Sequence, residues 1–196
     1  MELRGSSAAR RGASLALGGL LLACLAAYFW TDMSWTDDQD EITLHVNTYE
    51  QILTVKAGEL ILWQAPVSTS YYGLGEEEGS HRTPRGKHRI VEKIGDGEPL
   101  YAVFKHRQPT GEIWDTAASE EEREEEGDLI LTRILWLAGQ EAHNRNSQER
   151  YIYFHGTNHE DAIGTPSSIG CIRLKNADML RLFDEYTSVN TPVVIE

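Results

Sequence analysis

From Ile42 to the C-terminus, apolar and polar residues alternate with a period of two in most segments, and this pattern is typical of a mainly β chain. Short turn signals that contain glycine separate several of these segments, and Ala57-Gly58 closes a hairpin. We therefore predict about seven or eight strands in a β-sandwich or a partly closed barrel. The expected strands are Ile42–Asn47, Gln51–Lys56, Glu59–Gln64, Lys87–Ile94, Leu100–His106, Leu129–Leu137, Tyr151–Phe154 and Thr191–Glu196.

One segment departs clearly from this alternation and predicts a helix. In Asn176–Tyr186 the apolar residues fall at helical spacing, and Asn176 is a residue type that caps helix N-termini. Two further segments lack strand character. Gly73–Gly86 is rich in glycine and charge and predicts a long loop, and the Thr110-Gly111 pair predicts a turn.

The N-terminus contains an apolar segment that sets it apart from the β region. Ala13–Trp30 carries no charge over 18 residues, close to the minimum for a helix that crosses a bilayer. Arginines precede this segment and acidic residues follow it, so residues 1–12 are expected in the cytoplasm. Residues 13–30 are then a single-pass membrane anchor, residues 31–41 a stalk, and residues 42–196 an exported domain. This predicts a membrane-anchored protein whose main domain lies on the side of the membrane opposite the cytoplasm.

Two alternatives to a retained anchor remain open at this point. Residues 13–30 could be a cleaved signal peptide, although no Ala-x-Ala pattern ends the apolar segment. Cys24 follows Leu21-Leu22-Ala23 as in a lipoprotein cleavage site, although the residues after it stay apolar up to Trp30. The sequence does not predict an oligomeric state.

The charge of the chain excludes one class of partner. It has 31 acidic and 18 basic residues and a formal net charge of −13, whereas binding to nucleic acid phosphates requires a basic surface. Much of the excess lies in the acidic run Ser119–Asp128, which is typical of a solvated loop or helix face. We assign this run no chemistry.

Two residues that can carry out nucleophilic catalysis lie near the end of the chain. His155 ends an apolar strand, and Cys171 follows it by 16 residues, directly after the small turn Ser168-Ile169-Gly170. An imidazole within reach of a thiol can accept its proton and so activate it. Taken singly, Cys171 could equally be a buried small hydrophobe and His155 a hydrogen-bonded histidine at a strand end. No group of Cys and His residues has metal-ligand spacing, so no metal is expected.

The residues around this pair resemble the signature of the L,D-transpeptidases of the YkuD type. The main matches are His155-Gly156-Thr157-Asn158 and Ser168-x-Gly170-Cys171-Ile172-Arg173-Leu174. The whole resemblance covers Ile42–Glu196. Four earlier segments also match in the right order: Pro66-Val67-Ser68-Thr69-Ser70, Gly73-x-Gly75, Thr83-Pro84-x-Gly86 and Thr132-Arg133-Ile134-Leu135.

The resemblance implies a β-rich enzyme that remodels peptidoglycan stem peptides without a cofactor. Cys171 matches the nucleophile that attacks the L,D peptide bond of a tetrapeptide stem, forms a thioester and releases D-alanine. His155 matches the base, and the carbonyl group of Gly156 matches the group that fixes the imidazole tautomer. Backbone N–H groups near Gly170 and Cys171 are expected to hold the oxyanion. The resemblance also implies sensitivity to carbapenem-type acylating agents.

Three positions of the motif leave more than one role open. Arg173 could hold a substrate carboxylate or pair with a structural one, and we favour the substrate. Ser168 could contact the substrate or serve as a turn residue. Ile169 occupies a position where many members of the family have histidine, which puts contacts to the oxyanion or substrate in doubt.

The same acyl-enzyme is compatible with several outcomes. An amine of another stem gives a cross-link, an amine of an envelope protein gives a tether, and water makes the protein a hydrolase such as an L,D-carboxypeptidase. A module that binds peptidoglycan without turnover is a different class, which only Ile169 favours. A papain-like protease is disfavoured because its cysteine precedes its histidine in the chain.

Overall fold

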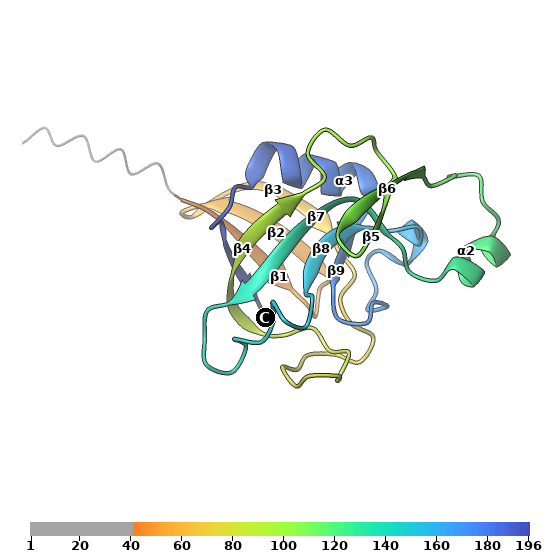
Figure 1. Ribbon diagram of the computed structural model, residues 1–196. Coiled ribbons are helices and arrows are strands. Elements are labelled where there is room, and N and C mark those ends of the chain that lie inside the picture. Colours follow the sequence, from red (N-terminus) through yellow and green to blue (C-terminus); the bar gives the residue numbers. More distant parts are fainter. Residues whose placement is uncertain (1–40) are drawn as a thin grey trace, which may run out of the picture. The chain divides into compact units, whose positions relative to one another are not determined.

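Ten strands of the computed structural model form one mixed sheet (Figure 1). The structure describes residues 41–196, so the predicted anchor at 13–30 and nearly all of the predicted stalk lie outside the described residues. The strands are β1 (Ile42–Asn47), β2 (Ile52–Ala57), β3 (Leu60–Pro66), β4 (Gly86–Ile94), β5 (Ala102–Lys105), β6 (Gln108–Ile113), β7 (Ile130–Gly139), β8 (Tyr153–Gly156), β9 (Ile172–Leu174) and β10 (Pro192–Ile195). The predicted mainly β class is therefore confirmed.

The strand order brings segments from both ends of the domain together. The main path runs β3-β2-β1-β10-β4-β7-β5-β6, while β8 pairs with the other edge of β7 and β9 pairs with β8. Only β1–β10 and β8–β9 are parallel pairs, and the remaining pairs are antiparallel. Strand β7 thus contacts three strands and lies at the centre of the fold.

The segment after β3 links the β3 end of this path to β9, which lies off the path. Ser68 and Arg173 exchange backbone N–H···O bonds of 2.9 Å in both directions, which joins the chain after β3 to β9. Ser168 N–H donates to Thr69 O at 3.0 Å, and Tyr71 N–H donates to Ser168 O at 2.9 Å. Of the two predicted architectures, these bonds correspond to the partly closed barrel. They also fix the turn that precedes Cys171.

The core forms because the alternating strands place one set of apolar side chains inside. The main cluster includes fully buried Leu44, Leu53, Leu135 and Phe154, and burial of each such side chain stabilises the fold by roughly 1.5–3 kcal/mol. A smaller cluster contains Ala102, Phe104, Ile134 and Tyr153, and Trp136 and Cys171 pack against it. The candidate cysteine therefore lies at the border of the second cluster.

Helical segments lie outside the sheet. Helix α3 (Asn176–Arg181) packs on β7 and β8 and continues into the wider helical turn η2 (Leu182–Tyr186), which confirms the predicted helix at 176–186. Helix α2 (Glu120–Glu126) buries none of its side chains and lies on the long connection between β6 and β7 (Figure 1). Residues Glu160–Ala162 form the short 3-10 turn η1. Within residues 41–196, no helix is both long enough and apolar enough to cross a membrane.

The prediction that Asn176 caps the helix is wrong. Lys175 occupies the N-cap position, and the Asn176 side chain instead connects three segments. Its Nδ2 donates to Thr157 O and to Glu160 Oε1, both at 2.7 Å, and its Oδ1 accepts from Thr132 Oγ1 at 2.6 Å. The Asn176 amide also packs against Gly156 and leaves no room for a side chain there. This amide therefore holds the end of β8, next to His155, in place.

Two strands differ from the sequence-based expectation. Strand β6 spans Gln108–Ile113, where a turn was predicted at Thr110-Gly111, and the actual hairpin turn lies at His106 and Arg107 with φ of 52° and 64°. All six side chains of β6 are exposed, so the strand lacks the alternation that would reveal it. Strand β9 has only three residues and is wholly buried, which also hides the period of two.

Candidate active site

His155 lies on β8, a strand of four buried residues between β7 and β9. Its Nδ1 is 2.7 Å from the carbonyl oxygen of Gly156, which can only accept, so Nδ1 carries the proton and donates. The lone pair of Nε2 is then free to accept a proton from another group. Burial lowers the pKa of His155, and the charge of Asp128 opposes this effect. The imidazole is therefore neutral at rest.

Cys171 lies at the start of β9, one residue before Ile172. The parallel register pairs Phe154 with Ile172 and His155 with Arg173. Because side chains alternate between the faces of neighbouring strands, Cys171 and His155 point to the same face. The Cys171 side chain is half-buried, and its Sγ–H donates to Tyr151 O at 3.4 Å. Within residues 41–196, no hydrogen bond joins Sγ to His155.

The surroundings of Cys171 keep the thiol protonated. Burial raises the pKa of Cys171 to about 12, although a hydrogen bond from the Tyr153 backbone N–H and the charges of Arg173 and Arg150 oppose this shift. A thiolate is the reactive form, so the resting thiol requires a base at the moment of attack. His155, with its free Nε2, is a candidate base on the same face.

The turn before Cys171 is held by side-chain hydrogen bonds. The hydroxyl of Ser168 accepts from Gly170 N–H at 3.2 Å and donates to Cys171 O at 2.6 Å. Thr83 Oγ1 donates to Gly170 O at 2.9 Å. Of the two roles open for Ser168, this geometry is that of the turn residue. Because Gly170 N–H is engaged, the Cys171 N–H is the better placed of the two expected oxyanion donors.

Glycine at position 170 is required by backbone conformation. Gly170 has a φ of 133°, in a region that side chains disfavour, while a Cβ there would meet Ile152 only at 3.5 Å. Its flexibility, rather than a lack of space, allows the turn to present Cys171.

Arg173 lies beneath the site in a buried ion pair. Its side chain is 3% exposed, and Nη1 is 3.1 Å from Asp128 Oδ1. The hydroxyl groups of Ser68 and Ser167 also accept from Nη2. This is the structural pairing that the sequence left open. The substrate contact that we favoured for Arg173 stays a prediction, and the geometry does not favour it.

A pocket of about 310 Å³ connects these groups. His155, Gly170 and Cys171 line it, which places three of the predicted site residues around one space. Ile169 also lines the pocket and is 66% exposed. The remaining lining residues are His81, Asp128, Ile130, Arg150, Tyr151, Ile152 and Tyr153. Ser168, Arg173 and Gly156 do not line this pocket.

The sequence reasoning did not assign several of these lining residues to the site. Asp128 ends the acidic run to which we assigned no chemistry, yet it accepts from Thr157 Oγ1 at 2.9 Å and pairs with Arg173. Its position directly before the strand Leu129–Leu137 was the only signal in the sequence. His81 lies in a loop far from the motif, and no local pattern places it near Cys171.

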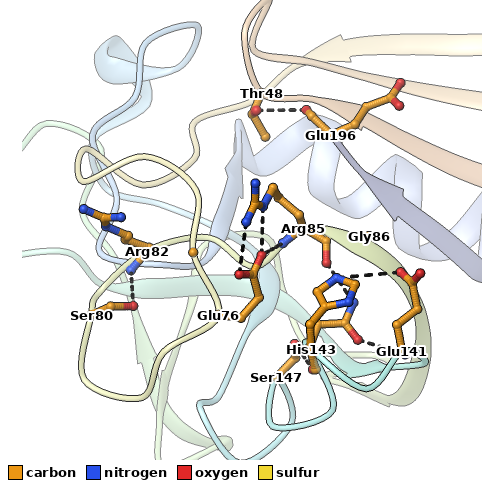
Figure 2. Close-up of polar contacts among 12 residues, drawn as sticks. Thr48, Glu76, Ser80, Arg82, Arg85, Gly86, Glu141, His143, Ser147 and Glu196 are labelled. Carbon is orange, nitrogen blue, oxygen red and sulfur yellow. Dashed lines mark hydrogen bonds and ion pairs between the residues drawn. The ribbon is translucent and has the colours of Figure 1, made fainter.

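The loop at 73–86 forms one wall of the pocket and is held by charged contacts. Glu76 accepts from Arg85 Nε at 2.9 Å and Nη2 at 3.3 Å (Figure 2). Arg150 donates to Gly75 O at 3.1 Å and to Arg82 O at 2.6 Å, which ties both arms of the loop to the strand side of the pocket. The sequence left the role of Arg150 undecided. In the structure, its side chain connects the two arms of this loop through hydrogen bonds.

The described part of the chain contains no cluster of side chains that could bind a metal ion. Residues 41–196 contain no group of three or more His, Cys, Asp or Glu side chains arranged to hold an ion. The expectation that the reaction needs no cofactor stays a prediction.

Two solved structures are similar to this chain in fold. An L,D-transpeptidase from Xylanimonas cellulosilytica (residues 123–326) is similar with a TM-score of 0.52 and 15% identity, over 89% of this chain and 69% of that chain. An L,D-transpeptidase from Mycobacterium smegmatis has a TM-score of 0.50 and 16% identity, over 80% of this chain and 58% of that one. This chain thus covers less than two thirds of the Mycobacterium structure. At these identities the likeness shows the fold alone.

Sequence comparison provides the assignment to a family. No curated protein matches the chain significantly. The family model described as the YkuD L,D-transpeptidase catalytic domain matches residues 41–195, nearly all of the described part of the chain. The chain therefore belongs to the YkuD family of L,D-transpeptidase catalytic domains.

Proposed function

We propose that this protein is a peptidoglycan L,D-transpeptidase in which Cys171 is the nucleophile and His155 the general base. The observation that carries the proposal is the placement of both side chains on one face of adjacent strands, in one pocket, with His155 Nδ1 held by Gly156 O at 2.7 Å. This hydrogen bond directs Nε2 as the proton acceptor.

The first half of the reaction forms an acyl-enzyme. Nε2 of His155 accepts the thiol proton as Cys171 Sγ attacks the carbonyl carbon of the L,D peptide bond. Hydrogen bonds between base and nucleophile commonly tighten only in the substrate complex, so their absence at rest is compatible with this step. The Cys171 N–H donates to the oxyanion. The C–N bond then breaks, the imidazolium returns the proton to the departing amine, and D-alanine leaves a thioester behind.

The second half transfers the acyl group. An acceptor amine attacks the thioester carbonyl, and His155 takes the proton that the amine loses. The C–S bond then breaks, and the imidazolium returns this proton to the sulfur, so Cys171 leaves as the thiol. The pKa of Cys171, raised to about 12, makes the free thiolate costly, so proton transfer accompanies each attack. We further propose that residues 13–30 anchor the chain in the inner membrane and that the domain acts in the periplasm.

The test is intact-mass spectrometry of the purified full-length chain with a synthetic stem tetrapeptide. The native protein should gain the mass of the acylated stem while D-alanine is released. Cys171→Ala should gain none, although it should still fold and bind the peptide. A second amine-bearing stem should then give a cross-linked product.

Other outcomes would change the proposal. If the thioester forms but only a shortened stem accumulates, the protein is a hydrolase. If the native protein binds the peptide but neither gains mass nor releases D-alanine, it is a non-catalytic binding module.

A further inference from the structure

Three aromatic side chains form a wall between the pocket and the β5–β6 hairpin. They are Trp136 on β7, Tyr153 on β8, and Tyr151 just before β8, and we call them the aromatic wall. Trp136 lies 5.8 Å from Tyr153 and 6.1 Å from Tyr151 between ring centroids. Tyr151 and Tyr153 line the pocket together with Cys171. The wall is thus a direct extension of the proposed active site.

Tyr151 has features that packing alone does not require. Its φ is 58°, an uncommon conformation for a residue with a bulky side chain. Its carbonyl oxygen accepts from Cys171 Sγ, yet its side chain is 53% exposed. Strained backbone of this kind is concentrated at functional sites. The strained backbone therefore suggests a functional role for the exposed ring of Tyr151.

Arg107 covers the aromatic wall from the β5–β6 turn. The centre of its guanidinium lies 4.7 Å from the Trp136 ring centroid and 5.2 Å from that of Tyr151. Arg107 also lowers the pKa of Tyr153, against the larger opposite effect of burial. Stacking on rings fixes a guanidinium while its N–H edge stays available.

Arg107 forms no close ion pair in the described part of the chain, although the charge of Glu92 contributes to raising its pKa. None of the ion pairs in residues 41–196 includes it. Two other arginines near Cys171 are already engaged, because Arg173 pairs with Asp128 and Arg150 donates to Gly75 O and Arg82 O. The stacked guanidinium of Arg107 therefore makes no close ion pair within the protein, and its N–H groups can bind an anionic ligand.

We propose that Arg107 binds a carboxylate group of the acyl donor and selects donors that carry this group over amidated ones. This inference rests on the proposed function. A planar guanidinium can bind a carboxylate through two parallel hydrogen bonds, and rings that hold it in place reduce the entropy lost on binding. The chain has a formal net charge of −13, so an anionic peptide needs a local cation near the pocket.

The experiment compares two stem tetrapeptides that differ only in a carboxylate or a primary amide on the side chain of the acyl-donor residue. The rate of thioester formation on the full-length chain is measured without an acceptor, so carboxylates of the acceptor have no influence. The native protein should prefer the carboxylate peptide about tenfold or more, as expected for a charged hydrogen-bonded pair. Arg107→Gln should lose this preference by slowing only the carboxylate peptide, and Arg107→Lys should keep part of it.

Arg89→Gln is the matched control, because Arg89 is an exposed arginine on β4 whose guanidinium donates to Asn190 at 3.0 Å. It should keep the native preference. The proposal is overturned if Arg107→Gln slows both peptides equally, if the native protein shows no preference, or if the loss appears only when an acceptor is added. The last outcome would assign Arg107 to the acceptor.

A second measurement separates this proposal from the proposed function. If neither peptide forms a thioester, the proposed function fails, but Arg107 can still be tested with thiol reagents of matched size and opposite charge. An anionic and a cationic methanethiosulfonate both modify Cys171 without acyl transfer. Arg107→Gln should lower the ratio of the anionic to the cationic rate several-fold, while Arg89→Gln should not. An unchanged ratio in Arg107→Gln would refute an anion site at Arg107.

Discussion

The proposed mechanism depends on the thiol of Cys171, and the protonation state of this thiol at rest can be measured. Burial raises its pKa to about 12, so its reactivity toward a small neutral reagent should follow the small thiolate fraction. We predict that alkylation of Cys171 by iodoacetamide in the substrate-free protein accelerates roughly tenfold per pH unit between about pH 7 and 10. Peptide mapping after timed quenching measures this rate. A plateau near neutral pH would instead reveal a preformed thiolate–imidazolium pair.

The Arg173–Asp128 pair is the second residue-scale feature that can be tested. Asp128→Asn leaves the guanidinium of Arg173, whose side chain is 3% exposed, without a charged partner. Removing one partner of a buried pair typically costs about 3–5 kcal/mol, whereas replacing both partners with uncharged groups costs less. Asp128→Asn should therefore lower the free energy of unfolding more than the double variant Asp128→Asn, Arg173→Met. Urea unfolding measures both, and equal stability of Asp128→Asn and the native protein would contradict the structural role.

Single residues were predictable from the sequence where their roles are local. His155, Gly156 and Cys171 belong to a short motif, and the fold places them together because β8 and β9 are adjacent. The partner of Arg173 could not be predicted, because Asp128 lies 45 positions earlier and ends an acidic run that is otherwise solvated. Sequence patterns give residue types, but they do not give contacts between distant segments.

At the scale of elements, the loop at 73–86 can be tested through its hydrogen bonds to residues 146–150. Arg150 joins its two arms through Gly75 O and Arg82 O, and Asn146 Nδ2 donates to Glu76 O at 3.0 Å. We predict that Arg150→Met increases amide hydrogen exchange in this loop and leaves exchange in β4 and β7 unchanged, because only the loop loses hydrogen bonds. Arg145→Met, an exposed arginine nearby in the chain, is the control. Faster exchange throughout the sheet would show a global effect instead.

The strands that could be predicted from the sequence are those whose side chains alternate between buried and exposed positions. Strand β1 begins and ends where the alternation at 42–47 does. Strand β6 was missed because Thr110-Gly111 was interpreted as a turn and all side chains of the strand are exposed. Its hairpin turn uses His106 and Arg107 rather than glycine. Strand β6 is defined by its hydrogen bonds to β5. Pairing of this kind cannot be predicted from the local pattern of apolar and polar residues.

At the scale of the whole molecule, the path of paired strands from β3 through β4, β7 and β8 to β9 makes the stability of the site depend on residues far from it. His88 on β4 is paired with both β10 and β7, near the middle of this path. Its buried ring has Nδ1 3.0 Å from Gly86 O and Nε2 3.0 Å from Ser147 Oγ. A change of charge at this position should therefore affect global unfolding rather than one local segment.

The pH dependence of unfolding provides the test. Burial lowers the pKa of His88 in the folded state, so between this value and the ordinary pKa of about 6.5 the unfolded chain binds more protons. The free energy of unfolding must then fall as pH decreases below about 6.5, and it levels off below the folded-state pKa. We predict that His88→Gln, which cannot gain this charge, loses less stability than the native protein between about pH 7.5 and 5.5 in urea titrations. Carboxylates that titrate in this range act equally in both proteins, so parallel losses would mean that His88 does not couple pH to the fold.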